Sequence, residues 1–212
     1  MELRESLLFY AVTDRRWLRG RSLAQCVEQA LRGGVTMIQL REKELDEEAF
    51  LREALELREL TRRFGVPLII NDSVEIARAC GADGVHIGQD DESLAEARAA
   101  LGPDRIIGVS AHSVEEARKA FEGGADYLGC GAVFPTGTKQ DVSILSREEL
   151  RAITSSVPIP AVAIGGITAE NLRLLAGTGI AGAALVSAVF AQERIEEASR
   201  SLRKELQGLA RF

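Results

Sequence analysis

Three cations and two carboxylates stand just after short apolar runs, in positions where they could bind phosphate groups. They are Arg41 and Lys43 after "TMIQL", Asp72 after "PLIIN", Asp91 after "GVHIGQD", and Lys139 within "FPTGTKQD". Arginine makes forked contacts to phosphate, and lysine acts as a mobile point charge. Two neighbouring carboxylates would raise each other's pKa unless a cation joined them, and Mg²⁺ typically takes one or two carboxylates together with phosphate oxygens. The combination predicts a magnesium-dependent site for a phosphorylated ligand.

A second group of residues is suited to an anion through hydroxyl and backbone N–H groups. The segment Phe134–Asp141 combines a proline, a glycine, two threonines and a lysine directly after the apolar run "YLGCGAV". Gly165, Gly166 and Val186 would add backbone N–H groups in the loops after two later strands, which is a frequent phosphate site in barrel enzymes. The sequence therefore predicts two anion sites that share one mouth.

Each of these residues also has a purely structural interpretation. Asp72 could cap a helix that starts at Ser73, and Asp91 could cap the next helix. Arg41 and Lys43 could be solvated charges that pair with the glutamates of "REKE". Such interpretations would together have to explain polar groups at nearly every strand end, and this favours a site.

Two histidines lie near the same strand ends. His86 stands between apolar neighbours and is predicted to be a packed histidine with a backbone hydrogen-bond partner. Ser110 and His112 are two residues apart on one predicted strand, so their side chains run parallel at about 6.5 to 7 Å. That separation is too large for a nucleophile and its base, which argues against a catalytic triad.

The elements that must position these residues are short strands that alternate with amphipathic helices. Helices are predicted over Asp46 to Phe64 and over Ser113 to Glu122, the second with a Ser113–Glu116 capping box. The predicted strands are "LLFYAVT" from Leu7, "TMIQLR" from Thr36, "PLIIND" from Pro67, "GVHIG" from Gly84, "RIIGVSA" from Arg105, "YLGCGAV" from Tyr127, "IPAVAIGG" from Ile159 and "GAALVSAV" from Gly182. Eight such units predict a closed α/β barrel, the (β/α)8 TIM barrel, whose strand ends meet at one mouth. An open sheet is disfavoured because no dinucleotide-binding glycine motif follows the first strand.

Composition narrows the class of protein further. The 212 residues, 46% hydrophobic, predict a single domain over 1–212. A net charge of -6 argues against a nucleic-acid partner. Cys26, Cys80 and Cys130 are predicted to be reduced, buried thiols, which favours the cytoplasm. The first apolar run is too short for a signal peptide, and no run approaches membrane-spanning length. A homo-oligomer stays possible.

The successive motifs "QLREK", "IIND", "GVHIGQDD", "IGVSAH", "FPTGTK" and "VAIGGI" resemble those of the thiamine phosphate synthase family across essentially the whole chain. The resemblance implies a (β/α)8 barrel that joins hydroxymethylpyrimidine diphosphate to hydroxyethylthiazole phosphate with Mg²⁺, forming thiamine phosphate and releasing pyrophosphate. It also implies a dissociative mechanism, in which the aminopyrimidine stabilises a methylene cation that the thiazole nitrogen captures.

Carried over motif by motif, the resemblance assigns roles at one mouth. The residues that would contact the pyrimidine diphosphate, the last of them beside the metal, are Gln39, Arg41, Lys43 and Asn71. The carboxylates that would hold Mg²⁺ are Asp72 and Asp91. The residues that would hold the departing pyrophosphate are Ser110 and Lys139, which would act in catalysis together with Arg41. The residues that would meet the thiazole phosphate are Thr136, Thr138, Gly166, Val186 and Ser187.

Two departures from the family pattern and two rival functions stay open. Ser73 stands where the family often has a charged residue, and "QDVSILSREEL" after Lys139 lacks a frequent glycine. One rival is a thiazole tautomerase, a related barrel that uses a histidine, for which His112 would serve. The other rival is a phosphate-binding barrel without catalysis.

Overall fold

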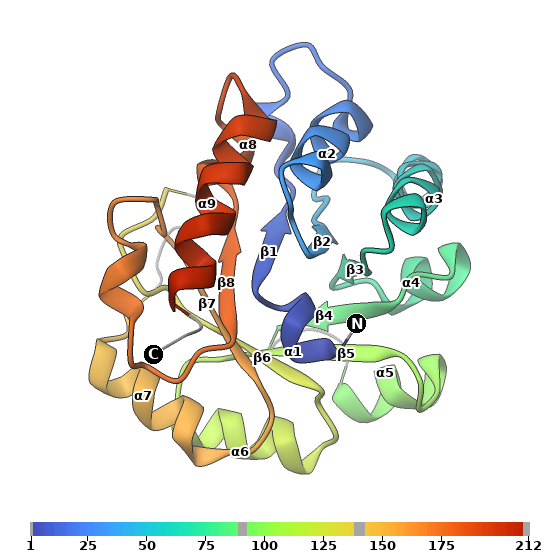
Figure 1. Cartoon of the computed structure of the whole chain (residues 1–212). Coiled ribbons are helices and arrows are strands. Elements are labelled where there is room, and N and C mark those ends of the chain that lie inside the picture. Colours follow the sequence, from blue (N-terminus) through green and yellow to red (C-terminus); the bar gives the residue numbers. More distant parts are fainter. Residues whose placement is uncertain (1, 89–92, 138–142, 210–212) are drawn as a thin grey trace.

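Eight parallel strands form a closed barrel in the order of the sequence, with helices around its outside (Figure 1). The computed structural model describes residues 2–88, 93–137 and 143–209. The strands are β1 (Phe9–Val12), β2 (Met37–Leu40), β3 (Leu68–Asn71), β4 (Gly84–Ile87), β5 (Ile106–Ala111), β6 (Tyr127–Cys130), β7 (Ala161–Ile164) and β8 (Gly182–Leu185). The predicted (β/α)8 barrel is confirmed, and each of the eight predicted segments contains a strand, although the last strand ends at Leu185.

Helices connect the strands, with one exception. The α-helices of the described residues are α1 (Leu3–Ser6), α2 (Leu23–Arg32), α3 (Glu47–Phe64), α4 (Val74–Cys80), α5 (Leu94–Leu101), α6 (Val114–Glu122), α7 (Arg147–Ser156), α8 (Ser187–Phe190) and α9 (Ile195–Leu209). Two 3-10 helices are η1 (Arg15–Trp17) and η2 (Leu172–Leu175). Residues 165–181, all of them described, cross from β7 to β8 with only η2, so this unit of the barrel lacks a full α-helix.

Side chains alternate along each strand between the barrel interior and the layer of helices. Tyr10, Ile69, Tyr127 and Val162 belong to a buried interior cluster, and a larger apolar cluster fills the space between strands and helices. Leu3 of α1 packs against the interior cluster, and Figure 1 shows α1 at the end of the barrel where β1 begins. The carboxyl ends of the strands therefore form the end of the barrel where a ligand can enter.

The tripeptide "GAD" occurs at residues 81–83 and again at 124–126, and its aspartate fixes the start of a strand in both places. Asp83 accepts the N–H of the first residue of β3 at 2.8 Å and pairs with Arg58 at 3.1 Å. Asp126 accepts the N–H of Ile107 at 2.7 Å and pairs with Arg98 at 2.7 Å. Both aspartates lie at the end of the barrel away from the predicted site, so the repeat is structural.

Serine side chains cap the helices that follow the two predicted metal carboxylates. The N-cap of α4 is Ser73, whose hydroxyl accepts the N–H of Ile76 at 3.1 Å. The alternative that Asp72 caps this helix is therefore wrong. The N-cap of α5 is Ser93, whereas Asp91 lies outside the described residues.

The capping box predicted at the start of α6 forms only in part. Ser113 accepts the N–H of Glu116 at 3.1 Å. The carboxylate of Glu116 does not return this bond, because it accepts the N–H of His112 at 2.7 Å instead. Glu116 thereby supports a residue of the predicted site rather than the helix end alone.

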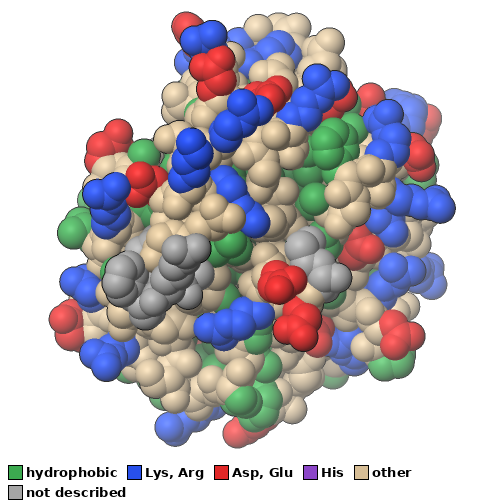
Figure 2. Space-filling model, in the orientation of Figure 1, with side chains coloured by type: hydrophobic (Ala, Val, Ile, Leu, Met, Phe, Trp, Pro, Cys, Tyr) green, Lys and Arg blue, Asp and Glu red, His purple; other side chains and the backbone are tan. Residues whose placement is uncertain are grey.

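The three cysteines are free and buried. The predicted reduced, buried thiols are therefore confirmed. Burial raises the pKa of each thiol, that of Cys130 to about 12. Within the part of the chain that the structure describes, no helix has the length and apolar character to cross a membrane. Figure 2 shows basic and acidic side chains interspersed over the visible face.

Candidate active site

A pocket opens at the carboxyl ends of the strands, and we call it the mouth pocket. Its apolar lining includes Val162 and Ile164 of the barrel interior. The predicted site residues that line it are Gln39, Arg41, Asn71, Ser110, Thr136, Gly166, Val186 and Ser187. Three predicted residues, Asp91, Thr138 and Lys139, lie outside the described residues.

Two of the lining residues occupy different positions from those predicted. Ser110 lies within β5 as predicted, whereas His112 follows this strand instead of lying on it. Ser187 begins helix α8 instead of belonging to the last strand, which ends at Leu185. The backbone N–H groups at the start of a helix have no acceptor within the helix, so this position suits an anion better than a strand position would.

Lys43 and Asp72 form an ion pair between the segments that follow β2 and β3. The Lys43 ammonium donates to the Asp72 carboxylate, of whose side chain 28% is exposed. The backbone of Asp72 is left-handed, with a φ of 65°, a conformation that aspartate and asparagine adopt more readily than other non-glycine residues. Its N–H donates to the carbonyl of His86 at 2.8 Å. Lys43 thus pairs across strands, and its interpretation as a charge paired with Glu44 is wrong.

Glu42 anchors the segment that carries Arg41 and Lys43. Only 3% of its side chain is exposed. One carboxylate oxygen accepts the N–H groups of Lys43 and Glu44, each at 2.8 Å, and the other accepts Nε–H of Arg15 at 2.9 Å. Burial would raise the pKa of Glu42, but these donors lower it below its ordinary value. The carboxylate therefore stays charged and holds the backbone after β2 in one shape.

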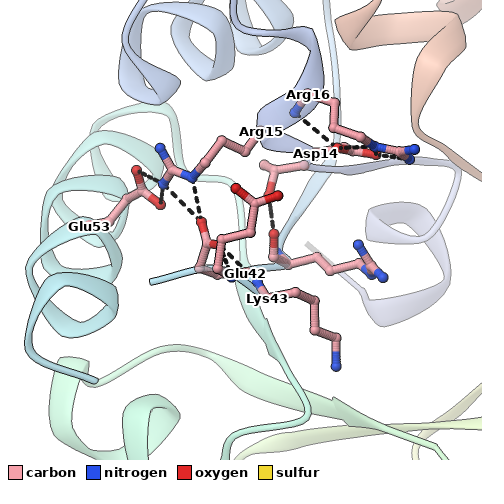
Figure 3. A network of polar contacts seen from close by, with 9 residues as sticks. Asp14, Arg15, Arg16, Glu42, Lys43 and Glu53 are labelled. Atoms are coloured by element: carbon pink, nitrogen blue, oxygen red, sulfur yellow. Dashed lines mark hydrogen bonds and ion pairs between the residues drawn. The ribbon is translucent and has the colours of Figure 1, made fainter. Parts of the chain in front are cut away.

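Arg15 reaches from η1 and lies between two carboxylates, as Figure 3 shows. Its Nη2 binds both oxygens of Glu53 on α3 at 2.8 Å, in addition to the bond to Glu42. Burial, together with the charges of Glu42 and Glu56, raises the pKa of Glu53 above its ordinary value although the bond and charge of Arg15 lower it. Neither Arg15 nor Glu53 was predicted as part of the site, and the charged turn "TDRRW" after the first strand is the only sequence signal for this anchor.

The backbone of Arg41 is fixed from β1. Its N–H donates to Oγ1 of Thr13 at 3.0 Å, and that hydroxyl donates to the Arg41 carbonyl at 3.4 Å. Asp14 is buried and binds Arg16 at 2.6 Å. Burial would raise the pKa of Asp14, but the hydrogen bonds from Arg16 and the charge of Arg41 lower it. Among the described residues Arg41 has no ion pair of its own, so its guanidinium can serve a ligand phosphate.

The loops after β6 and β7 lie directly against each other. The N–H of Phe134 donates to the carbonyl of Gly165 at 3.1 Å. Gly166 has a φ of 64°, and a Cβ here would lie 2.4 Å from the carbonyl oxygen of Pro135. Only glycine permits this approach. The contact brings Thr136 and Gly166 into the lining of the same pocket.

A chain of side-chain hydrogen bonds runs through the barrel interior beneath the mouth pocket. Gln39 donates from Nε2 to the Tyr10 hydroxyl at 2.7 Å, and the hydroxyls of Tyr10 and Tyr127 are 2.8 Å apart. His86 lies 3.0 Å from the Tyr127 hydroxyl through Nδ1 and 3.1 Å from Oγ of Ser110 through Nε2. Burial raises the pKa of both tyrosines well above the ordinary value, so both hydroxyls stay protonated.

His86 is buried as predicted, but its ring bonds are to side-chain hydroxyls instead of the predicted backbone group. Tyr10 and Tyr127 were not predicted as site residues. The signal for them is the strand alternation, because Tyr127 is in register with Gly108 and Gly108 with His86. Residues in register across neighbouring strands point to the same side of the sheet.

His112 lies in the pocket lining with its ring oriented by a carboxylate. Its Nδ1 is 3.1 Å from Oε2 of Glu116, and 38% of the side chain is exposed. In the neutral ring, a proton on Nδ1 bonded to Glu116 leaves Nε2 as an acceptor. His112 and Glu116 are thus arranged as an oriented base. Among the described contacts, none joins the His112 ring to Ser110, so these residues do not form a triad.

Of the two carboxylates predicted to hold Mg²⁺, the described chain contains one. Across residues 2–88, 93–137 and 143–209, no group of three or more His, Cys, Asp or Glu side chains could hold a metal ion. The described residues offer the carboxylate of Asp72 and the neighbouring amide of Asn71, and Asp91 lies outside them. Carboxylate and amide oxygens are ligands that Mg²⁺ accepts, so the donors present fit this ion.

The chain is similar to known proteins over most of its length. Residues 9–189 match the family model described as thiamine monophosphate synthase. The thiamine-phosphate synthase of Clostridium acetobutylicum is 49% identical over 191 residues, 90% of each chain, and that of Clostridium novyi is 47% identical over 91% of this chain and 95% of that protein. The structure of the thiamine phosphate pyrophosphorylase from Pyrococcus furiosus superposes with a TM-score of 0.90 at 40% identity, covering 98% of this chain and 99% of that one. The chain belongs to the thiamine monophosphate synthase family.

Proposed function

We propose that this protein joins hydroxymethylpyrimidine diphosphate to hydroxyethylthiazole phosphate, giving thiamine phosphate and pyrophosphate. The observation that carries the proposal is the arrangement of two anion-binding groups around one pocket. Arg41 follows β2 and Thr136 follows β6, which are opposite strands in an eight-stranded barrel closed in sequence order. Asn71 at the end of β3 is opposite Gly166 after β7 in the same way. Two phosphorylated substrates can therefore enter from facing sides with their reacting ends between them.

The pyrimidine diphosphate would lie on the β2 and β3 side. Gln39 donates its amide N–H to Tyr10, and its amide oxygen would accept a hydrogen bond from the amino group of the pyrimidine. Arg41 and Lys43 would bind the diphosphate, and Ser110 would donate to the departing pyrophosphate. Lys139, which lies outside the described residues, is proposed as the second cation for the leaving group.

The thiazole phosphate would lie on the β6 to β8 side. Thr136 offers a hydroxyl, Gly166 a backbone N–H without a side chain in the way, and Val186 and Ser187 the N–H groups at the start of α8. A helix start after the eighth strand is a frequent phosphate site in such barrels. Thr138 is proposed to join this group from outside the described residues.

We propose Asp72 and Asp91 as the carboxylates that bind Mg²⁺, with Asn71 beside them. When bound, Mg²⁺ would supply positive charge that stabilises the pyrophosphate as the carbon–oxygen bond breaks. The ion pair with Lys43 orients the Asp72 carboxylate toward the segment that would bind the diphosphate. Lys43 would bind the phosphate groups directly, and Asp72 would bind the Mg²⁺ that contacts the same groups.

The chemistry that these residues support is dissociative. The carbon–oxygen bond of the diphosphate would break first, the amino-substituted ring would stabilise the methylene cation, and the thiazole nitrogen would form the new carbon–nitrogen bond without any proton transfer. Arg41 and Ser110 would hold the negative charge that leaves, and the apolar Val162 and Ile164 would limit access of water to the cation. Such a reaction needs orientation and charge stabilisation but no protein nucleophile.

The test is a mass-spectrometric assay of the purified protein with both substrates and Mg²⁺, repeated with a chelator. Thiamine phosphate that forms only with the metal supports the proposal. The absence of thiamine phosphate, with the thiazole phosphate still bound by the folded protein, would overturn it. The oriented His112–Glu116 pair favours a thiazole tautomerase as the second candidate, and isomerisation that His112→Ala abolishes would identify it. Binding of both ligands without conversion of either would point to a non-catalytic barrel.

A further inference from the structure

The buried chain from Gln39 to Ser110 has a direction that its chemistry fixes. An amide nitrogen can only donate, so the Tyr10 oxygen accepts from Gln39. Tyr10 is buried with 1% exposure, and its proton goes to its other partner, the oxygen of Tyr127. Tyr127 has received one bond and therefore donates its own proton to Nδ1 of His86.

This direction determines the form of the imidazole. An Nδ1 that accepts from Tyr127 carries no proton, so the neutral ring bears its proton on Nε2. Nε2 lies 3.1 Å from Oγ of Ser110 and donates to it. The Ser110 hydroxyl is then an acceptor toward His86, and its own proton must be directed away from the ring.

We propose that His86 is a positioning residue that makes Ser110 a hydrogen-bond donor toward the mouth pocket. This inference rests on the proposed function, in which Ser110 donates to the departing pyrophosphate. The chain begins at Gln39, the proposed ligand of the aminopyrimidine, and ends at Ser110, the proposed ligand of the leaving group. Both ends line the pocket, so one set of buried bonds would orient the two contacts to the same substrate.

Two glycines make room for the rings of this chain. A Cβ at Gly108 would lie 2.1 Å from Cζ of Tyr127, and a Cβ at Gly129 would lie 2.8 Å from Cε1 of His86. The two rings meet over Gly108 with centroids 5.5 Å apart. Strands β5 and β6 thus have glycine where the rings of Tyr127 and His86 need space. This indicates that the barrel fixes the position of His86.

The first test reads the imidazole directly, without activity. The chain has two histidines, His86 and His112, so long-range ¹H–¹⁵N NMR of the histidine-labelled protein contains two rings, and the His86→Gln variant identifies them. We expect His86 to carry its proton on Nε2, with Nδ1 as the acceptor. In Tyr127→Phe, which keeps the ring but removes the donor, we expect this preference to be lost. A proton on Nδ1 of His86 in the wild-type protein would overturn the inference.

The second test asks whether His86 acts through Ser110. We expect Ser110→Ala to lower kcat about 10²- to 10³-fold, as for loss of one donor to a developing charge. His86→Leu is expected to lower kcat about 10- to 100-fold, as for other groups that orient a functional side chain, with the KM for the thiazole phosphate unchanged. His86→Gln, which keeps an N–H near Ser110, should recover part of this loss. The double variant His86→Leu/Ser110→Ala should be no slower than Ser110→Ala.

The outcomes separate this inference from the proposed function. No thiamine phosphate from the wild-type protein means that the proposed function fails, whatever the NMR result. Product from the wild-type protein, together with full activity of His86→Leu or additive losses in the double variant, overturns the role of His86 alone. If His86→Leu fails to fold, Tyr127→Phe takes its place, and wild-type kcat in that variant would overturn the inference.

Discussion

Arg15 donates from Nε to the carboxylate of Glu42 at 2.9 Å, and this bond joins the segments that leave β1 and β2. The other oxygen of the same carboxylate accepts the N–H groups of Lys43 and Glu44. The Glu42 carboxylate thus fixes the backbone of Lys43 and Glu44, directly after Arg41, whose own backbone is held by Thr13. Because neither cation is held by a regular element beyond β2, their positions depend on these bonds.

Replacing Glu42 by glutamine should weaken both the fold and the pyrimidine diphosphate site. The amide oxygen of glutamine can still accept a hydrogen bond, but its NH₂ group is a donor. This NH₂ group must face either Arg15 or the two backbone N–H groups, which are donors themselves. We expect a loss of about 1 to 3 kcal/mol in the free energy of unfolding, measured by urea denaturation, and a higher KM for the pyrimidine diphosphate.

The matched control is Glu59→Gln, the same chemical change at an exposed position of α3. It should stay within about 0.5 kcal/mol of the wild-type protein. If Glu42→Gln matched this control in stability and in KM, the anchoring role of Glu42 would be refuted.

Acid should destabilise the protein partly through Glu42. Its pKa is lower in the folded protein than its ordinary value of 4.5, so it contributes stability above pH 4.5 that is lost as the pH falls through the lower folded pKa. Between about pH 5 and 3 the unfolding free energy of the wild-type protein should fall more steeply than that of Glu42→Gln. Parallel pH profiles of the two proteins in urea denaturation would contradict this assignment.

Gly166→Ala should damage the thiazole phosphate side alone. The new methyl group would need a left-handed backbone and would lie 2.4 Å from the Pro135 carbonyl oxygen. The backbone strain of about 1 to 2 kcal/mol would be relieved by separation of the loops after β6 and β7. We expect about tenfold weaker binding of the thiazole phosphate in calorimetry.

Gly208→Ala is the control for this substitution, since no atom lies within 4 Å of the position in α9. It should bind the thiazole phosphate as the wild-type protein does. Equal affinities of Gly166→Ala and Gly208→Ala would show that the contact between the loops does not shape the site.

The strands and most pocket residues could be predicted because they follow from local pattern. Gln39 and Arg41 are two residues apart, so a strand places them on one side, and both line the pocket. Parallel strands in a barrel end at one mouth, which is enough to gather Asn71, Ser110 and Gly166 from distant parts of the sequence.

The parts that could not be predicted depend on distances between elements. The bond between Tyr10 and Tyr127 spans 117 positions of the sequence, and its existence requires the register of the barrel and the two strand glycines. In the sequence Glu42 looks like a surface charge, because only the folded position of η1 places Arg15 beside it. Strand ends shift by one or two residues with local hydrogen bonding, which is why Ser187 was placed in β8 rather than at the start of α8.

Asp72→Asn should separate metal binding from folding. Asparagine tolerates the left-handed backbone that Asp72 adopts, so stability should change by less than about 1 kcal/mol. The lost charge should weaken the response to Mg²⁺, and we expect turnover to fall and half-saturation to require more metal. Asp126→Asn is the counterpart, since that carboxylate binds Ile107 and Arg98 at the other end of the barrel.

In Asp126→Asn we expect a loss of about 1 kcal/mol with an unchanged response to Mg²⁺. Urea denaturation and Mg²⁺ titrations of turnover on both variants give the comparison. Should Asp72→Asn lose as much stability as Asp126→Asn while keeping the wild-type magnesium dependence, Asp72 would be a structural partner of Lys43 and no metal ligand. If Asp72→Asn instead keeps its stability and loses its wild-type response to Mg²⁺, the ion pair with Lys43 serves to arrange the charges that bind the diphosphate.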